Sequence, residues 1–331
     1  MPGTDVLLVS LGSTAGLRAA DEELAGALRR AGAEVAVVAA ARPREVRTLA
    51  LTDLGWARAA RAAAEAGIAA HAPGSILYCT TTAALLWPRP GAIRLDALAA
   101  ANRPGRHGLW QRPLERRRLG QAPLLVPQDA GALLEAAVPP TPSVVVPIGV
   151  EPSGPPAPER DIAAITYAAN PAKKGLDRIL AAWTSARRDG EELVVTGTDA
   201  VPEAPGVRAA GSLDPAAYRA LLRRARVFVA AARREDYGLA QLEALADGCM
   251  LVTTRSPGPY AALPLAGALD GRLVGDDLAT ALRAALDDPV PDYATRALAA
   301  VAPYRRAAVD ATVRDQLLPA LLSAGRASSA P

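Results

Sequence analysis

Cysteine and histidine are scarce in this sequence of 331 residues, which contains two of each. Cys79 and Cys249 lie far apart and show neither metal-binding nor redox spacing, so we expect two buried thiols in a reducing compartment rather than a disulfide. His71 and His107 also lack the spacing of metal ligands. The sequence therefore predicts no metal centre and no disulfide framework.

Long apolar runs are absent as well. Runs such as Val35–Ala41 stop well short of the ~18 residues that a membrane-spanning helix needs. The N-terminus has no basic lead, and Asp5–Ser10 has the pattern of a first strand, so we expect no signal peptide. We expect a cytoplasmic protein, for which peripheral contact with the inner face of a membrane stays open. The net charge of +3 gives no indication of nucleic-acid binding.

Lysine occurs at one place only. Lys173 and Lys174 are adjacent, and arginine supplies all the other positively charged side chains of the lysine and arginine type. This composition is typical of a GC-rich bacterial genome. A lysine pair that persists against this trend has either a specific role or an ordinary place on the surface, and composition alone leaves both open.

Strand-like and helix-like segments alternate along the chain. The apolar runs of strand type are Val6–Ser10, Val35–Ala40, Ser75–Cys79, Ala92–Leu95, Leu124–Val126, Ser143–Val146, Ile162–Tyr167, Leu193–Thr196, Val227–Ala230 and Met250–Thr253. Helical spacing separates most of them. Such alternation with short connections favours right-handed crossovers and parallel sheets covered on both faces, which is an α/β fold.

The segment 147–158 is rich in proline and interrupts this alternation. We therefore predict a Rossmann-like domain over 1–148, a linker over 149–158 and a second domain over 159–303. Residues 304–331 carry helical spacing with no strand after it. We expect this last segment to pack back on the N-terminal domain.

The segment 234–248 carries the strongest chemical signal. Glu235 stands just before a predicted helix, and Glu243 lies within that helix beside its apolar stripe. The helix start at Gly238 offers free N–H groups to an anion. Carboxylates accept hydrogen bonds from sugar hydroxyls. The pattern indicates a site for a phosphorylated, hydroxyl-rich ligand.

Together, Glu235, Tyr237-Gly238 and Glu243 resemble the donor-binding domain of retaining glycosyltransferases of the GT-B fold (group 1, family 4-like). In that family a glutamate is followed by an aromatic-glycine pair and, after seven residues, by a second glutamate. Further matches follow in the expected order over roughly 160–290, namely Lys174-Gly175, the turn Gly211-Ser212-Leu213, Gly271-Arg272-Leu273-Val274 and Asp287-Asp288-Pro289. The occurrence of these motifs in order makes the resemblance specific.

The resemblance implies two Rossmann-like domains facing a central cleft, with the donor bound to the second and the acceptor to the first. It implies a hexosyltransferase-type enzyme that moves a sugar from a nucleotide-diphosphate donor to a saccharide, lipid or small-molecule acceptor. No cofactor would be required. The absence of an Asp-x-Asp pair agrees with metal-independent transfer.

The resemblance also implies roles for individual residues. Glu235 would contact the donor sugar or stabilise charge at its anomeric carbon, and Lys174 would neutralise the leaving diphosphate. Glu243 would accept from ribose hydroxyls; an ion pair with a nearby arginine is the structural alternative. The implied donor-binding set is Gly12, Gly16, Asn170, Lys173, Lys174, Gly197, Leu213, Tyr237, Gly238, Leu239 and Glu243.

The chain departs from the family pattern at Ala168. Family members carry an arginine there, six residues before the lysine, as a second diphosphate clamp. Lys173 or an arginine of the first domain would have to replace it, or catalysis would be weak. The loop Ser256–Tyr260 also departs from the family pattern, which leaves the donor sugar open.

The first domain carries fewer signals. Gly12–Gly16 follows the first strand and resembles a loop that faces the donor phosphates, although a plain strand-to-helix turn explains it equally well. Arg94 and Asp96 stand at the end of a predicted strand. We expect Arg94 to bind the acceptor and Asp96 to face the cleft as a catalytic residue; capping the next helix is the alternative for Asp96.

A basic cluster follows over 103–118, where six arginines and His107 surround Trp110 and Glu115 is the single acid. We expect Arg106 and His107 to bind an anionic acceptor or lipid headgroups, against the alternative of a solvated helix face. Two other functions stay open for the chain. One is a nucleotide-sugar binding protein with degenerate catalysis, and the other is a nucleotide-sugar epimerase, which would need more histidines than the chain has.

Overall fold

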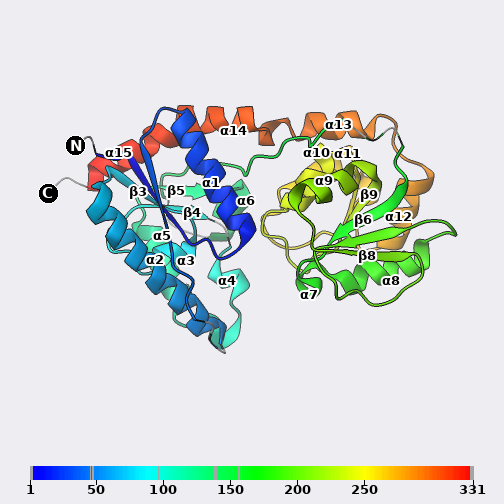
Figure 1. Cartoon of the computed structure of the whole chain (residues 1–331), viewed down its shortest axis with the longest axis horizontal. Coiled ribbons are helices and arrows are strands. Elements are labelled where there is room, and N and C mark those ends of the chain that lie inside the picture. Colours follow the sequence, from blue (N-terminus) through cyan, green and yellow to red (C-terminus); the bar gives the residue numbers. More distant parts are fainter. Residues whose placement is uncertain are drawn as a thin grey trace. The chain divides into compact units, whose positions relative to one another are not determined.

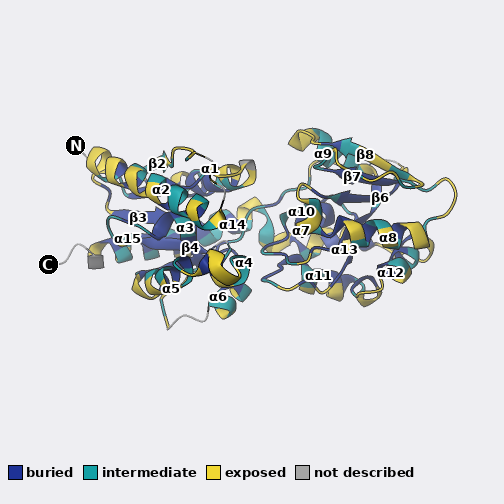
Figure 2. Cartoon of the chain, turned by 90° about the horizontal axis from the view of Figure 1, so that it is seen from below, coloured by how far each residue is buried: buried dark blue, intermediate teal, exposed yellow. Residues whose placement is uncertain are grey.

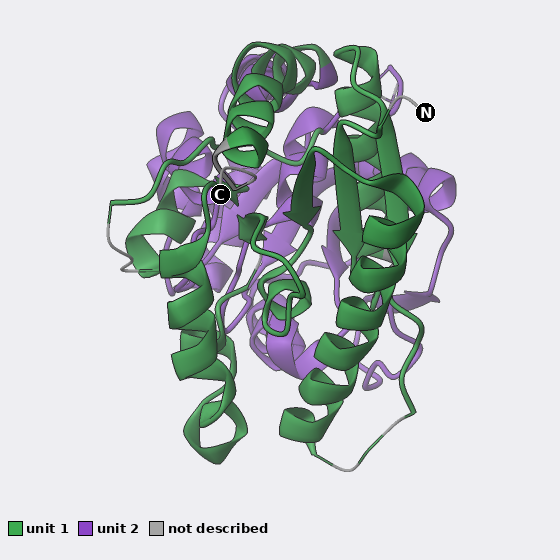
Figure 3. Cartoon of the chain, turned by 90° about the vertical axis from the view of Figure 1, so that its left-hand side faces the viewer, with its two compact units in different colours: residues 1–149, 307–331 green, residues 150–306 purple. Residues whose placement is uncertain are grey.

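The computed structural model describes residues 3–44, 46, 48–95, 97–136, 140–155, 157 and 159–328. The chain divides into two compact units, the first formed by 1–149 with 307–331 and the second by 150–306 (Figure 3). Asp96 lies outside the described residues. Its expected catalytic role therefore stays a prediction.

The first unit is a five-stranded parallel sheet in the order β2-β1-β3-β4-β5 (Figure 1). Its strands are β1 (Val6–Ser10), β2 (Val35–Ala39), β3 (Ser75–Tyr78), β4 (Ala92–Leu95) and β5 (Leu125–Pro127). Its helices are α1 (Ala15–Arg30), α2 (Leu49–His71), α3 (Thr81–Ala84), α4 (Ala99–Asn102), the 3₁₀ turn η1 (Gly105–Gly108), α5 (Gln111–Gln121), α6 (Ala130–Ala136), α14 (Arg306–Thr312), the π-helical turn Val313–Leu317 and α15 (Leu318–Ser328).

Alternation along β1 builds the two cores of this unit. Val6 and Leu8 face a core that contains Leu28 of α1, whereas Leu7 and Val9 face a second core that contains Ala60 of α2. The period of two along a strand puts successive side chains on opposite faces. The C-terminal segment enters the first core through four buried side chains, which are Val309, Val313, Leu317 and Leu321.

The second unit repeats the plan with a five-stranded parallel sheet in the order β10-β9-β6-β7-β8. Its strands are β6 (Ile162–Tyr167), β7 (Leu193–Thr196), β8 (Val207–Gly211), β9 (Ala225–Ala230) and β10 (Met250–Thr253). Its helices are α7 (Pro171–Lys174), α8 (Leu176–Ala186), α9 (Pro215–Arg224), α10 (Leu239–Ala246), α11 (Ala262–Leu269), α12 (Leu278–Asp287) and α13 (Tyr293–Ala300), with 3₁₀ turns at Gly271–Leu273 and Ala302–Tyr304.

Helices cover both faces of this second sheet. The helices α8 and α12 pack against each other on one side, and α9 and α10 pack against β9 on the other (Figure 1). In each unit the central strands are buried and the outer helix faces are exposed (Figure 2). The α/β fold with parallel sheets that the alternation predicts is confirmed.

Two sequence predictions of secondary structure are wrong. Ser143–Val146 forms no strand, because only Ser143 makes a bridge, to Leu125. The alternation also misses β8, where Arg208 and Ala209 are exposed at the sheet edge and hide the apolar signal. Both errors fall on short edge segments, where burial does not enforce a pattern.

The proline-rich segment is tied to the second unit. The backbone N–H and hydroxyl of Ser153 donate to the Asp247 carboxylate at 2.8 and 2.9 Å. Arg219 donates to the carbonyl of Glu151 at 2.7 Å. Residues 150–153 therefore belong to the fold of that unit.

Candidate functional site

Five loops of the second unit meet at the carboxyl edge of its sheet. The loop after β6 carries Asn170 and the lysine pair, and the loop after β9 carries Glu235. The loop after β10 runs to Tyr260, and those after β7 and β8 begin near Gly197 and Gly211. Ligands of open parallel sheets bind outside this edge.

Glu235 lies at the centre of these loops and is 6% exposed. Its Oε2 accepts from Lys174 Nζ at 2.7 Å and from Gln241 Nε2 at 3.0 Å. Its backbone N–H donates to the carbonyl of Pro257 at 3.0 Å. The ion pair balances a buried charge that would otherwise be costly, so Lys174 and Glu235 hold each other in place.

Lys174 reaches Glu235 because a glycine turns the chain behind it. Asn170 caps α7 by accepting from the N–H of Lys173 at 3.0 Å, and Pro171 occupies the first helical turn. Gly175 then adopts φ +67°, and a Cβ there would lie 2.1 Å from the carbonyl oxygen of Ala231. This close approach brings α7 against the end of β9.

Lys173 points elsewhere. Its Nζ donates to Asp236 Oδ2 at 2.9 Å, and Arg234 Nε donates to the other oxygen of that carboxylate at 2.7 Å. The Lys173 side chain is 45% exposed. The adjacent lysines thus pair with two adjacent acids, of which Glu235 is buried and Asp236 is half-buried.

Gly238 opens α10 with φ +90° and no side chain that caps the helix. A Cβ at this position would lie 2.7 Å from the ring of Tyr260, whose hydroxyl is 3.0 Å from Thr253 Oγ1. Tyr237 is buried, and its carbonyl accepts from the N–H of Ala261 at 3.0 Å. The N-terminus of α10, at Gly238 and Leu239, therefore follows Glu235 by three and four residues and can attract an anion.

Glu243 lies on α10 beside Arg219 of α9, with 3.6 Å between Oε1 and Nη1. Arg219 makes its shorter contact with Asp247, at 2.6 Å. Burial raises the pKa of the Glu243 carboxyl, the neighbouring Asp247 raises it further, and Arg219 opposes the shift. The expected alternative, an arginine beside Glu243, is thus present, but the contact is long and leaves the carboxylate able to accept a ligand hydroxyl.

Two positions expected to meet the nucleotide lie on neighbouring loops. Gly197 has φ +87°, and its N–H donates to the carbonyl of Gly211 at 2.7 Å, which joins the loops after β7 and β8. Leu213 is 36% exposed. Ala168 is fully buried, and its N–H donates to the carbonyl of Thr196 at 2.8 Å.

The expected residues of the first unit are less well gathered. Gly12 has φ +59°, and its carbonyl accepts from Arg18 at 2.7 Å, whereas Gly16 lies exposed within α1. Arg94 is 2% exposed and donates to Asp21 Oδ1 at 3.3 Å. Burial raises the pKa of Asp21. The structure thus corrects the expected acceptor contact of Arg94, because its side chain is enclosed beneath α1.

Arg106 and His107 are both exposed, on the turn η1. Trp110 beside them donates from Nε1 to the carbonyl of Ala50 at 3.3 Å, which fixes η1 against the start of α2. Arg112 donates to the carbonyls of Gly105 and Gly108 at 2.7 and 3.2 Å. Both predicted residues are therefore available to a partner.

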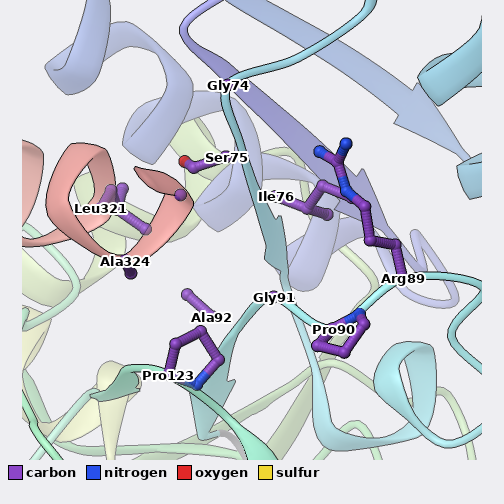
Figure 4. Close-up of a pocket in the computed structure, with 11 residues that line it drawn as sticks. Gly74, Ser75, Ile76, Arg89, Pro90, Gly91, Ala92, Pro123, Leu321 and Ala324 are labelled. Atoms are coloured by element: carbon purple, nitrogen blue, oxygen red, sulfur yellow. The ribbon is translucent and has the colours of Figure 1, made fainter. Parts of the chain in front are cut away.

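A cavity of about 180 Å³ lies elsewhere in the first unit (Figure 4). It is bounded by Ser75 of β3, Ala92 of β4 and Leu321 of α15. Both strands begin here, so the cavity is at the amino edge of the sheet. We assign no part of the candidate site to it.

Within the described ranges, no three acidic, histidine or cysteine side chains gather as a metal site would require. Nor is any described helix both long enough and apolar enough to cross a bilayer. Sequence reasoning missed Gln241, the second donor to Glu235, and Arg219, the partner of Glu243. Gln241 lies two residues before Glu243, and only the helical turn of α10 could have indicated that it faces back to Glu235.

The family model described as glycosyl transferases group 1 matches residues 160–306. No curated protein matches the chain in sequence. Among solved structures, sucrose-phosphate synthase from Thermosynechococcus elongatus aligns with a TM-score of 0.68 and 15% identity over 97% of this chain and 100% of its own.

Two further structures align as completely. HepE from Anabaena, in complex with UDP and glucose, gives a TM-score of 0.70 and 13% identity over 95% of this chain and 99% of its own. WaaG, a glycosyltransferase involved in lipopolysaccharide biosynthesis, gives a TM-score of 0.66 and 14% identity over 98% of this chain and 100% of its own. At such identities structural likeness shows the fold, and the family match shows the kind of enzyme. Residues 160–306 thus resemble the glycosyl transferases group 1, and the chain has the GT-B fold.

Proposed function

We propose that the protein transfers a sugar from a nucleotide-diphosphate donor to a hydroxylated acceptor, with retention at the anomeric carbon and without a metal ion. The observation that carries the proposal is the cluster of Lys174, Glu235 and Gln241 beside the uncapped start of α10. It puts a cation, a carboxylate and free helix N–H groups at the ligand-binding edge of one sheet.

Diphosphate binding would begin with an exchange of partners at Lys174. In the structure its ammonium group is held by Glu235. An arriving diphosphate offers stronger, charge-assisted hydrogen bonds to the same ammonium and to the N–H groups of Gly238 and Leu239. Glu235 is then free to accept from the donor sugar while Gln241 still holds it.

The chemical step follows from this arrangement. The bond between the anomeric carbon and the diphosphate oxygen breaks, and the acceptor oxygen forms its bond on the same face. The acceptor proton passes to the departing phosphate. Lys174 and the α10 N-terminus stabilise the charge that develops on that phosphate, and Glu235 stabilises positive charge on the sugar.

The nucleoside would occupy the neighbouring loops. Glu243 would accept from the ribose hydroxyls, oriented by Arg219, and Gly197 and Leu213 would border the base. Lys173 would release Asp236 to take the place of the missing clamp at Ala168. UDP-glucose is the first donor to test. HepE, which shares the fold and is 12% identical in sequence to this chain, was solved in complex with UDP-glucose.

The test is nucleoside diphosphate release from a panel of donors and acceptors. We expect Glu235→Ala and Lys174→Ala each to lower turnover by roughly 100-fold or more, as loss of a transition-state contact does. Glu192→Ala is the matched control, because Glu192 pairs with Arg208 at the far end of β7. Undiminished turnover in both site variants would refute the proposal, and donor binding without turnover in the wild type would instead support a binding protein.

A further inference from the structure

Four large aliphatic side chains stand exposed around one end of the first unit. Val46, Leu49, Leu51 and Leu109 are 44, 52, 55 and 65% exposed. Leucine and valine side chains are normally buried, and exposed ones gathered in one place mark an interaction surface.

Contacts hold these four residues in one region. The hydroxyl of Thr52 bonds to the carbonyl of Val46 at 3.5 Å, and Trp110 bonds to the carbonyl of Ala50 at 3.3 Å. The start of α2, which carries Leu49 and Leu51, thus lies beside the turn η1, which is followed by Leu109 (Figure 1).

Exposed basic side chains surround the aliphatic ones. Arg42 and Arg44 precede Val46, and Arg106 and His107 lie on η1. Arg116 lies on α5, one helical turn beyond Arg112. All of these side chains are exposed except that of Arg112. We call the four aliphatic residues with Arg44, Arg106, His107 and Arg116 the basic-apolar patch.

Acidic side chains do not offset this charge in the described parts of 42–61 and 97–121. Two carboxylates occur there, and both are buried and engaged: Asp53 accepts from Arg103 at 2.6 Å, and Glu115 accepts from the N–H of Ala99 at 2.9 Å. Among the described residues of these segments the exposed charge is therefore of one sign, and Glu45, between Arg44 and Val46, lies outside the described residues.

We propose that the basic-apolar patch docks the protein on the surface of an anionic lipid bilayer. Aliphatic side chains enter the boundary between headgroups and acyl chains, and the arginines around them contact lipid phosphates. Trp110, an interfacial residue type, lies at the border. A second copy of the chain is the weaker fit, because a symmetric pair would oppose like charges.

Vesicle co-sedimentation of the full chain tests this docking, and it does not depend on the sugar-transfer proposal. We expect binding to vesicles with one third phosphatidylglycerol at physiological salt, little binding to pure phosphatidylcholine, and loss of binding at high salt. The double variant Arg106→Gln with Arg116→Gln should lower the partition coefficient by about 25-fold, at about fivefold for each arginine.

The aliphatic part is tested by Leu51→Ser and Leu109→Ser, each expected to lower partitioning roughly tenfold. Leu134→Ser is the matched control, since Leu134 is 85% exposed on α6 of the same unit, and Arg314→Gln matches the loss of charge. Equal binding of all variants, or none by the wild type, would overturn the proposal. So would a dimer in sedimentation velocity that Leu51→Ser and Leu109→Ser dissociate.

Discussion

At the scale of single residues, the two glutamates of the motif occupy different environments. Glu235 faces a cation and an amide donor at hydrogen-bond distance, whereas Glu243 is half-buried near an arginine that is occupied by Asp247. The first carboxylate is therefore held rigidly as a charged group. The second retains unused acceptor capacity, which suits hydroxyl recognition.

Gln241 positions Glu235 and should affect the chemical step more than donor binding. Replacing it by leucine removes the N–H donor at 3.0 Å while keeping a side chain of similar length. A hydrogen bond to a charged group contributes about 1.5–3 kcal/mol, so we expect kcat to fall roughly tenfold or more with KM little changed. Steady-state kinetics checks this against Gln316→Leu, an exposed glutamine on the π-helical turn. A rise in KM with kcat unchanged would contradict the positioning role.

Glu243 should make the stability of the second unit depend on pH. Burial raises its folded-state pKa above the ordinary 4.5, so the stability that its protonated form contributes is full below the unfolded pKa and is lost as pH rises through the folded one. Glu243→Gln lacks this loss. Urea midpoints of unfolding should therefore be measured from pH 4 upward. The midpoint of the variant should rise relative to that of the wild type as pH rises. A constant difference between the two would show that Glu243 does not titrate in this way.

At the scale of elements, glycines let the loops of the candidate site approach each other. Gly175 ends α7 against Ala231, and a Cβ at Gly258 would lie 2.3 Å from the carbonyl oxygen of Glu235. Any side chain at either position would push apart the loops that carry Lys174 and Glu235. The geometry of the site thus depends on backbone contacts as well as on side chains.

Gly175→Ala should destabilise the protein more than Gly190→Ala does. Both glycines have positive φ, +67° and +82°, so both variants incur about 1–2 kcal/mol of left-handed strain. Gly190 has no atom within 4 Å of the added Cβ, whereas Gly175 meets the carbonyl of Ala231 at 2.1 Å. Chemical denaturation measures the loss in the free energy of unfolding for each variant. If the two losses are equal, the close approach of α7 to β9 does not constrain the fold.

Sequence patterns predict the buried strands well and the edges poorly. Val6–Ser10 and Ile162–Tyr167 are recognised because nearly all of their residues are apolar and buried, the exceptions being the buried polar Ser10 and Thr166 and the partly buried Tyr167. Arg94 is misjudged for the opposite reason. A charged residue at a strand end suggests a ligand site, and the buried partner Asp21 lies far away in sequence.

The candidate site is likewise predictable only in part from the sequence. Lys174, Glu235 and Glu243 stand in a motif whose spacing carries the resemblance, so their identity needs no structure. Gln241 lies within that motif but has no fixed part in it. Its role follows from the direction in which α10 turns its side chain, which is a tertiary property.

At the scale of the whole molecule, the chain leaves the first unit and returns to it. Residues 150–306 form the second unit, and the segment from Ala307 onward completes the core of the first. The two passages between units are joined by a hydrogen bond of 2.8 Å from the N–H of Val150 to the carbonyl of Tyr304. Integrity of the first unit therefore depends on the far end of the chain.

A chain that ends at Arg306 should lose the first unit and keep the second. It lacks Val309, Val313, Leu317 and Leu321, which together contribute on the order of 6–12 kcal/mol, as much as a typical domain's whole stability. Amide hydrogen exchange should show protection retained in β6 and β9 and lost in β1 and β3. Protection of β1 in the shortened chain would contradict the dependence of the first core on α14 and α15.

Titration calorimetry of nucleoside diphosphates tests whether Lys174 exchanges Glu235 for a donor diphosphate. The Lys174→Met variant should bind the preferred diphosphate at least tenfold more weakly than the wild type, because it loses a charge-assisted contact and leaves Glu235 unpaired. Arg208→Met, which removes an exposed cation of the same unit, should bind as the wild type does. Equal affinity in Lys174→Met and the wild type would contradict this exchange.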